Sequence, residues 1–220
     1  MKKYELTTET LQFAGRTLHR IKAVKDFGSI KAGEFGGYIE NEKNLSQDDN
    51  AWIYGEAMAI GNARVFGNAK ILGNAHIFGN ARVYDDAIVH NNARIYDNAI
   101  VYDNAIVSDY AEVCENAKVC DDADVYGFSR IFGNAKIFGN ATIKGNAKVH
   151  DDIDYIVFKN FWSSGRYFTW TRSNNKWSVG CFYGTGEELI KKAYADSVKS
   201  GREYERVVRY VESILADERK

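Results

Sequence analysis

The sequence lacks an excess of charge, a long apolar run and a set of closely spaced cysteines. It carries 29 basic and 30 acidic side chains, for a net charge of −1, which argues against general nucleic-acid binding. No apolar run approaches a membrane span, and residues 1–5 lead into polar sequence instead of a signal peptide. The three cysteines, Cys114, Cys120 and Cys181, are scattered. We therefore expect reduced thiols, no metal site, no membrane association and a cytoplasmic protein.

What the sequence does have is a repeat of six residues. A small residue recurs from Ala51 to Ala147 seventeen times without insertion or deletion, and it is Ala at every position except Ser129. Ile or Val follows two residues later in every repeat except the one with Ala59. Asn or Asp usually precedes the small residue. A period of six held this strictly predicts a parallel β-helix of the hexapeptide type.

Each hexad reads as a short strand and a turn. The small and branched residues alternate with polar ones, as a strand with one buried face requires, and Gly, Asp and Asn tolerate the positive φ of a tight turn. Three hexads close a triangular coil of eighteen residues, so 51–150 form nearly six coils. We expect a mainly β protein with a small N-terminal cap at 1–50, the β-helix at 51–150 and a C-terminal α+β module at 151–220.

The flanking segments carry weaker signals. In the cap, 17–25 and the second half of 31–40 read as strands, and the glycines at 33, 36 and 37 lack the spacing of a phosphate loop. In the module we expect strands at 155–158, 167–171 and 177–182, with a hairpin turn at 173–176. Two helices should follow, with capping boxes at Thr185/Glu188 and Ser200/Glu203. The second should bury Tyr204, Val207, Val208, Val211, Ile214 and Leu215.

Several of these motifs resemble a known family. Residues 17–21, 33–42 and 44–48 are similar to the opening of the YdcK-like hexapeptide-repeat proteins of enteric bacteria and their phages. The resemblance implies a left-handed β-helix. Members of this family are described as acyltransferases on the basis of their fold alone. The resemblance therefore implies no particular catalytic residue for this chain. The stretch 180–185 resembles a C-terminal module of phage and prophage hexapeptide proteins, which implies a mobile-element origin.

Residues eighteen apart should stack into columns on the outside of the coils. One column is Arg64, Arg82, Ile100, Lys118 and Lys136, beside Phe66, Tyr84, Tyr102, Cys120 and Phe138. The cations of this column could bind a phosphate and its rings could stack on a base, or these side chains simply cover the strands or form a subunit interface. Outward Ile88 and Ile106 with Leu72 favour a homo-oligomer, most simply a trimer packed along helix faces, or a C-terminal module that folds back onto this face. A corner of Asp85, Asp103 and Asp121 needs either a cation or screening by water.

One corner breaks the rule of the repeat twice in register. The position before the small residue, which we expect to need positive φ, is Tyr110 and then Phe128. We expect their neighbours to be His90, Ser108 and Tyr126 on one side and Arg94, Glu112 and Arg130 on the other. Tyr110, Phe128, Arg94, Arg130, His90 and Tyr126 form the candidate site for a nucleotide or another anionic ligand. The alternative is that the two rings plug a subunit interface.

Two functions from different classes remain open. The first is a non-catalytic binding protein, phage-associated, that sequesters a phosphorylated signalling molecule as a counter-defence or binds a protein partner, without a cofactor. The second is an acyltransferase that uses acetyl-CoA and a surface histidine, His90 or His76, as general base. Enzymes of that kind usually extrude a loop over the site, and the repeat from 51 to 147 is uninterrupted.

Overall fold

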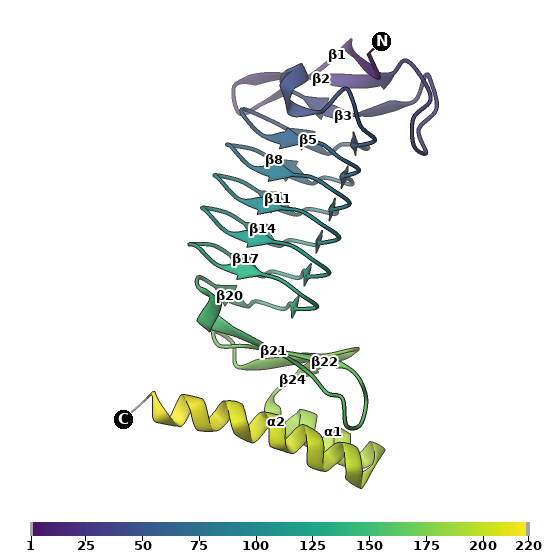
Figure 1. Cartoon of the computed structure of the whole chain (residues 1–220). Coiled ribbons are helices and arrows are strands. Elements are labelled where there is room, and N and C mark those ends of the chain that lie inside the picture. Colours follow the sequence, from purple (N-terminus) through teal and green to yellow (C-terminus); the bar gives the residue numbers. More distant parts are fainter. Residues whose placement is uncertain (1, 219–220) are drawn as a thin grey trace.

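The spacing of eighteen residues decides how the strands pair in the computed structural model, which describes residues 2–218. Ile88 lies between Lys70 and Ile106, and Ile100 lies between Arg82 and Lys118, all in parallel register. The chain therefore winds into a parallel β-helix with an N-terminal cap at one end and a helical module at the other (Figure 1). The predicted architecture and the predicted outer columns are confirmed.

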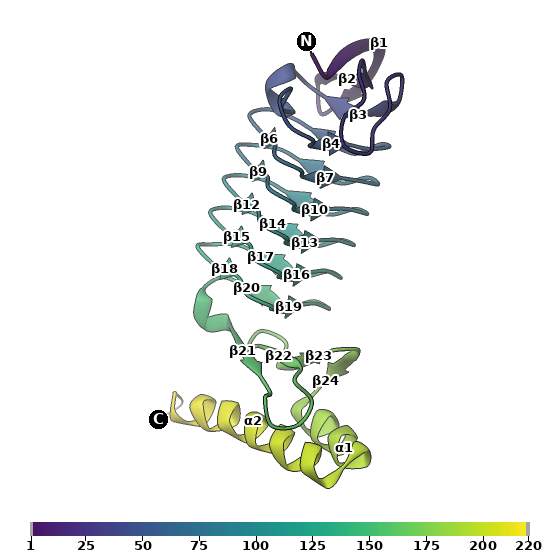
Figure 2. The same ribbon diagram turned by 45° about the vertical axis from the view of Figure 1, so that its right-hand side comes forward.

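Three sheets form the sides of the β-helix, and Figure 2 shows two of them from another side. The nine-stranded sheet contains β1 (Tyr4–Phe13), β2 (Arg16–Ala23), β3 (Phe35–Ile39), β5 (Met58–Ala59), β8 (His76–Ile77), β11 (Arg94–Ile95), β14 (Glu112–Val113), β17 (Arg130–Ile131) and β20 (Lys148–Val149). The six-stranded sheet contains β4 (Trp52–Ile53), β7 (Lys70–Ile71), β10 (Ile88–Val89), β13 (Ile106–Val107), β16 (Asp124–Val125) and β19 (Thr142–Ile143). The five-stranded sheet contains β6 (Arg64–Val65), β9 (Arg82–Val83), β12 (Ile100–Val101), β15 (Lys118–Val119) and β18 (Lys136–Ile137).

The interior is built from the two apolar positions of the hexad. The repeat alanines from Ala51 to Ala147 are fully buried, and so are the branched residues two positions later, which line the same core. Ala99, for example, is 0% exposed and shares this core with Ala81 and Ala117. The small side chain lets the chain turn at the corner, while the branched one fills the space between the three sheets.

The corners differ from the prediction in one respect. The left-handed residue is the one two positions before the alanine, not the one directly before it: Asp109 has φ 58° and Gly127 has φ 75°. Tyr110 and Phe128 therefore do not occupy left-handed positions, and the expectation that they break a backbone rule is wrong. The sequence pattern misled us because Gly/Asp and Asn alternate as a pair, and either member could have taken the unusual conformation.

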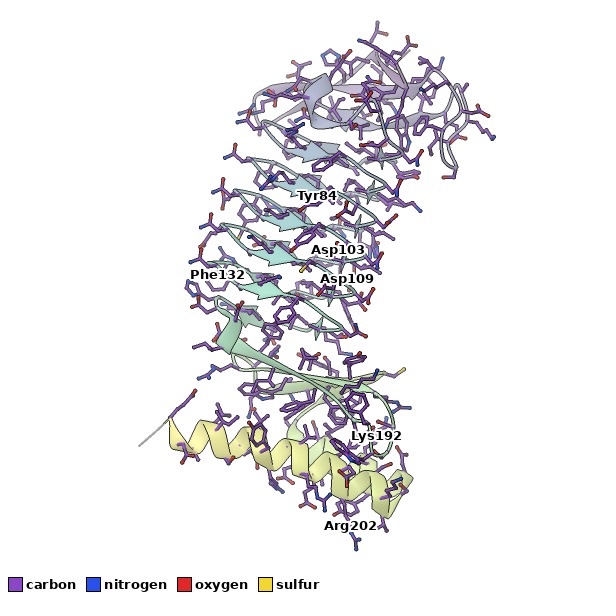
Figure 3. All side chains as sticks on the ribbon, in the orientation of Figure 1. Tyr84, Asp103, Asp109, Phe132, Lys192 and Arg202 are labelled. Carbon is purple, nitrogen blue, oxygen red and sulfur yellow. The ribbon has the colours of Figure 1, made fainter. Side chains whose placement is uncertain are left out.

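Side chains at the corners link successive coils. The Asn68 Nδ2 donates to Asp86 Oδ1 at 3.1 Å, and Asn80 repeats this contact with Asn98. Carboxylates at the left-handed position accept backbone N–H groups of the next coil, as Asp103 Oδ2 does from Asp121 at 3.2 Å. Figure 3 shows Asp103 and Asp109 along the side of the β-helix. The acidic corner is thus held by hydrogen bonds to backbone N–H groups.

The cap extends the β-helix instead of forming a separate layer. Strand β3 pairs in parallel with β5, with Tyr38 opposite Met58, and β2 and β1 then add to it in antiparallel fashion. The glycines of β3 allow this close approach, because a Cβ at Gly37 would lie 2.3 Å from the carbonyl oxygen of Ala57. Strand β1, which the sequence did not predict, completes the edge. The short 3₁₀ helix η1 (Glu42–Asn44) follows β3.

The C-terminal module contains one antiparallel sheet and two helices. These are β21 (Tyr155–Lys159), β22 (Tyr167–Thr171), β23 (Lys176–Val179) and β24 (Phe182–Gly184), then α1 (Gly186–Asp196) and α2 (Val198–Asp217), after the 3₁₀ helix η2 (Asp152–Asp154). The strand expected at 177–182 is two strands, with a tight turn at Gly180 (φ 55°). The capping box of Thr185 and Glu188 is confirmed, whereas the second helix is capped by Ser197 and not by Ser200.

Strand β22 closes the open end of the last coil. The buried Thr169 hydroxyl accepts the Thr142 N–H at 2.9 Å, and the Ser173 hydroxyl accepts the Lys148 N–H at 2.7 Å. These hydroxyls replace the carbonyl groups that a further coil would have supplied. Within residues 2–218, no helix combines the length and apolar character needed to cross a bilayer.

Candidate functional site

The tip of the β1–β2 hairpin packs against the outer face of the nine-stranded sheet. Leu18, fully buried, packs there with Tyr38, Met58 and Ile60, and Leu11 and Phe78 join this outer cluster. The turn of the hairpin uses Ala14 (φ 49°) and Gly15 (φ 75°). The hairpin thereby projects over the outer face of the β-helix. A loop extruded from the repeat is therefore not needed to cover a site on this face.

A salt bridge holds the hairpin tip in place. Arg16 donates to both carboxylate oxygens of Glu40, at 2.8 and 2.9 Å, and Glu40 also accepts the Gly61 N–H at 2.6 Å. The Gly61 N–H and the Arg16 guanidinium lower the pKa of Glu40. The carboxylate therefore stays ionised near neutral pH and fixes the tip relative to the first coils.

A pocket of about 570 Å³ lies between this tip and the sheet. Its walls combine rings and aliphatic groups with a few polar groups that converge on the same space. The lining residues are Phe13, Ala14, Arg16, Ile60, Gly61, Asn62, His76, Phe78, Gly79, Asn80 and Arg94. This mixture of a mostly apolar wall and few polar groups is typical of small-molecule sites.

His76 is the ionisable group with the most perturbed surroundings in this pocket. It begins β8, is half-buried, and meets the ring of Phe13 edge to face at 5.2 Å. Burial, and secondarily the charge of Arg94, lower the pKa of His76 below 6.5. Its ring nitrogens have no hydrogen-bond partner among the described residues. A neutral imidazole with a free nitrogen can accept a proton from a bound molecule.

Arg94 lies one coil below His76 in the same column. Its guanidinium lies over the rings of Phe78 and Tyr96, at 5.6 and 5.8 Å, and 3.4 Å from a carboxylate oxygen of Glu112. Half of the Arg94 side chain is exposed to solvent. It can therefore bind an anionic group at the mouth of the pocket while it keeps His76 neutral.

The backbone supplies one more donor. The residue eighteen positions before Gly79 is Gly61, which has no carboxylate to accept the Gly79 N–H, whereas Asp109 accepts that of Gly127. The Gly79 N–H therefore has no acceptor among residues 2–218. Gly79 is one of the residues that line the pocket, as is His76.

The residues predicted from the sequence fall in two places. His76 and Arg94 come together in the pocket, whereas His90, the other histidine proposed as base, is outside its lining. His90 stacks in the column of Leu72, Ser108 and Tyr126, at the end of the six-stranded sheet. Tyr126 is covered by Lys144, whose ammonium lies 5.6 Å from its ring.

Tyr110 and Phe128 stack as the repeat predicts. Their rings are 5.0 Å apart and nearly parallel, and they are 56% and 71% exposed. They interrupt the ladder of corner asparagines between Asn92 and Asn146. Among the described residues, the guanidinium groups of Arg94 and Arg130 lie over other rings: that of Arg130 lies over Phe132 at 5.1 Å, and it donates to the Cys114 sulfur at 3.7 Å. A ligand site at this pair stays a prediction.

The cysteines of the β-helix are buried, although they occupy outward positions. Cys114 and Cys120 each occupy one position in an outer column that otherwise contains mainly aromatic residues, and both are buried. Burial raises the pKa of Cys120. Among the described residues, one group of possible metal ligands consists of Asp103, Cys120 and Asp121. Asp103 and Asp121 already accept backbone N–H groups, so this group needs no cation.

Sequence reasoning missed the hairpin residues of the pocket, Phe13 and Arg16. No periodicity connects 13–16 with 76–94, because the contact depends on how the cap folds back. The signal that could have indicated the hairpin was the pair Ala14-Gly15 between two stretches that combine Thr with scattered apolar residues, as strands with one buried face do.

The fold and the repeat define the class of protein as a parallel β-solenoid with hexapeptide repeats. Residues 75–91 and 93–109 match the family model described as YdcK beta solenoid repeat. The uncharacterized acetyltransferase YdcK of Escherichia coli (strain K12) is 36% identical in an alignment of 64 residues that covers 26% of this chain and 20% of that protein. The chain thus carries YdcK-type repeats, but its alignment spans only about a fifth of the curated relative.

Proposed function

We propose that the protein transfers an acyl group from a thioester to a hydroxyl or amine of a small acceptor in the pocket under the β1–β2 hairpin. The observation that carries the proposal is His76: a half-buried histidine with a lowered pKa and no hydrogen-bond partner among the described residues, in a pocket with Arg94. The similarity to a protein named as an acetyltransferase agrees with this chemistry.

In this reaction His76 accepts the proton of the acceptor group as that group attacks the thioester carbonyl. The new bond joins the acceptor to the acyl carbon, the carbon–sulfur bond breaks, and His76 returns the proton to the departing thiolate. The Gly79 N–H can donate to the oxygen on which negative charge develops. Arg94 can bind an anionic part of either substrate at the mouth of the pocket.

The residues present fit the reacting end of acetyl-CoA. The pocket volume suits an acceptor and an acyl group but not a whole coenzyme, so the nucleotide end would remain outside it. When bound, the coenzyme supplies an activated acyl group. The rings of Phe13 and Phe78 line the pocket beside His76 and would reduce the access of water to a bound thioester.

The test is thiol release from acetyl-CoA, measured with a panel of amine and hydroxyl acceptors. Replacing His76 with Gln should lower kcat/KM about 10²- to 10⁴-fold, the usual contribution of a general base. His90→Gln is the matched control and should keep full activity, since His90 lies outside the pocket. The proposal fails if His76→Gln keeps full activity while His90→Gln loses it. It also fails if no acceptor supports thiol release by the wild type.

A second candidate is a non-catalytic binding protein that uses Tyr110 and Phe128. The observation in its favour is that two stacked rings remain largely exposed on a rigid β-helix, which could extend their stack with the base of a nucleotide. A thermal-shift screen with nucleotides and cyclic nucleotides tests this. A stabilising ligand whose effect disappears in Tyr110→Asn/Phe128→Asn, but persists in His76→Gln, would support it over acyl transfer.

A further inference from the structure

A second concentration of exposed apolar side chains lies at the opposite end of the molecule from the His76 pocket. Phe161 and Trp162, in the loop between β21 and β22, are 72% and 69% exposed, and Tyr210 of α2 is 55% exposed. Large aromatic side chains left in solvent together mark interaction sites more often than scattered single ones do.

The loop that presents these rings is held by hydrogen bonds and not by apolar contacts. Asn160 is 3% exposed, and its side-chain oxygen accepts the N–H groups of Trp162 and Ser163 at 3.0 and 3.1 Å. Its amide donates to the Ser163 hydroxyl, and its backbone N–H donates to the Arg166 carbonyl. A buried asparagine with three side-chain hydrogen bonds thus fixes the loop that carries the exposed rings, which lowers the entropic cost of binding.

A groove of about 360 Å³ runs between this loop and α2. Phe158 and Tyr210, whose rings meet edge to face at 5.9 Å, line it together with Trp162 and Val207. Its volume is near the lower end of small-molecule sites and suits one large side chain with its neighbours. Trp, Tyr and Arg are also the residues that dominate the energetics of protein interfaces.

The groove has charged groups of both signs at its edge, and some of its cations are unpaired. Lys159, Glu203 and Arg206 line it, and the exposed face of α2 continues with Lys199, Arg202 and Arg209. Arg206 pairs with Glu203 at 2.7 Å, and Arg209 pairs with Glu187 and Glu212. Within residues 2–218, Lys159, Lys199 and Arg202 form no ion pair, and Figure 3 shows Arg202 projecting from α2 away from the β-helix. These positions follow one another at three- and four-residue intervals on α2, so they lie on one side of the helix.

We propose that this groove binds an acidic segment of a partner protein through one large apolar side chain. The apolar side chain fills the space between Trp162 and Tyr210, and flanking carboxylates meet Lys159 and Arg202, which form no ion pair within the described residues. A nucleic acid fits less well, because so few unpaired cations give few phosphate contacts and the chain as a whole has a net charge of −1.

Selection from a library of short random peptides on the full chain tests the proposal. The enriched peptides should share an aromatic or large aliphatic residue flanked by Asp or Glu. Their affinity should fall about tenfold or more in Trp162→Ala, because loss of a central aromatic anchor usually costs that much. It should also fall in Arg202→Glu and with added salt.

Phe35→Ala is the matched control, because Phe35 is another exposed aromatic, 54% accessible and close to Arg20 and Lys22 in the cap. Its affinity for the peptides should equal that of the wild type, and circular dichroism should show all variants folded. The proposal is overturned if no peptide is enriched, if the enriched peptides lack acidic residues, or if Trp162→Ala binds as the wild type does. It is overturned equally if the Trp162-dependent ligand is a thymidine oligonucleotide or a phosphatidylserine vesicle instead of a peptide.

Discussion

At the scale of single residues, the strictness of the repeat follows from the space inside each corner. Ala99 should not tolerate enlargement, because it is fully buried between the alanines of the coils above and below. Ala99→Leu should lower the free energy of unfolding by about 1–3 kcal/mol through overpacking. Urea denaturation measures this. Lys118→Leu, an exposed outward position, is the control, and an unchanged midpoint for Ala99→Leu would contradict the assignment of inner and outer faces.

His76 should make stability depend on pH. Its pKa is lowered in the folded state, so protonation disfavours the fold. The stability that neutral His76 contributes is fully present above pH 6.5 and is lost as pH falls through 6.5 toward the lower folded-state pKa. His76→Gln should therefore lose less stability than the wild type between pH 7 and pH 5. Identical pH dependence of the two melting temperatures would show that burial does not perturb His76.

At the scale of elements, β22 acts as the lid of the last coil through single hydroxyl groups. Thr169→Val should leave the buried Thr142 N–H without an acceptor and cost about 1–3 kcal/mol. Thr169→Ser keeps the hydroxyl and should retain most of the stability. Thermal unfolding of the two variants compares them directly, and equal melting temperatures would mean that the hydrogen bond does not contribute.

The Tyr110–Phe128 corner gives a test of the ladder between coils. Since Asp109 and Gly127 take the left-handed conformation, replacing both rings with Asn relieves no backbone strain but restores the run of corner asparagines. We expect stability within about 0.5 kcal/mol of the wild type, as for surface positions. Melting temperature and oligomer mass should be measured together: dissociation of an oligomer would assign the rings to an interface and remove the case for a ligand there.

These elements show how far the sequence could predict the fold. The hexad gave the sheets, the register and the inner core, because a strict repeat leaves one way to stack coils. It could not decide which corner residue takes positive φ, since Gly, Asp and Asn occupy both positions. In the module, the short turn at Gly180 lies inside a continuous β-prone stretch and carries no strong signal. The second helix begins at Val198 because the Ser197 hydroxyl caps it by accepting the Ser200 N–H.

At the scale of the whole molecule, one apolar face remains without a cover. Ile88 and Ile106, with Leu72, point outward and stay half-buried in the single chain. We expect a homo-oligomer, most simply a trimer packed along this face. Ile88→Asp/Ile106→Asp should then lower the mass measured by light scattering, while Lys70→Asp, in the same column, serves as the charge control. A monomeric wild type at micromolar concentration would contradict this expectation.

The candidate site shows the limit of sequence reasoning more clearly than the fold does. In the sequence, His76 stands out only as a surface histidine and Arg94 only as an expected neighbour of Tyr110 and Phe128, although the two lie eighteen residues apart in one column. The pocket itself depends on Phe13 and Arg16, which lie outside the repeat and reach the coils only because β1 and β2 fold over the sheet. Contacts of this kind depend on tertiary packing, and no local pattern encodes them.

The most direct test of the central claim is an NMR titration of the histidine rings, assigned with His→Gln variants. The chain has four histidines. The pKa values of two of them should be shifted in opposite directions from that of a free imidazole. The hydrogen bond to Asp151 raises the pKa of His150 above 6.5, whereas burial lowers that of His76 below 6.5. The account predicts this order and a shift of the His76 signals on addition of acetyl-CoA. If the pKa of His76 equals or exceeds that of His150, and acetyl-CoA does not shift the His76 signals, then His76 is not the base of an acyl-transfer site.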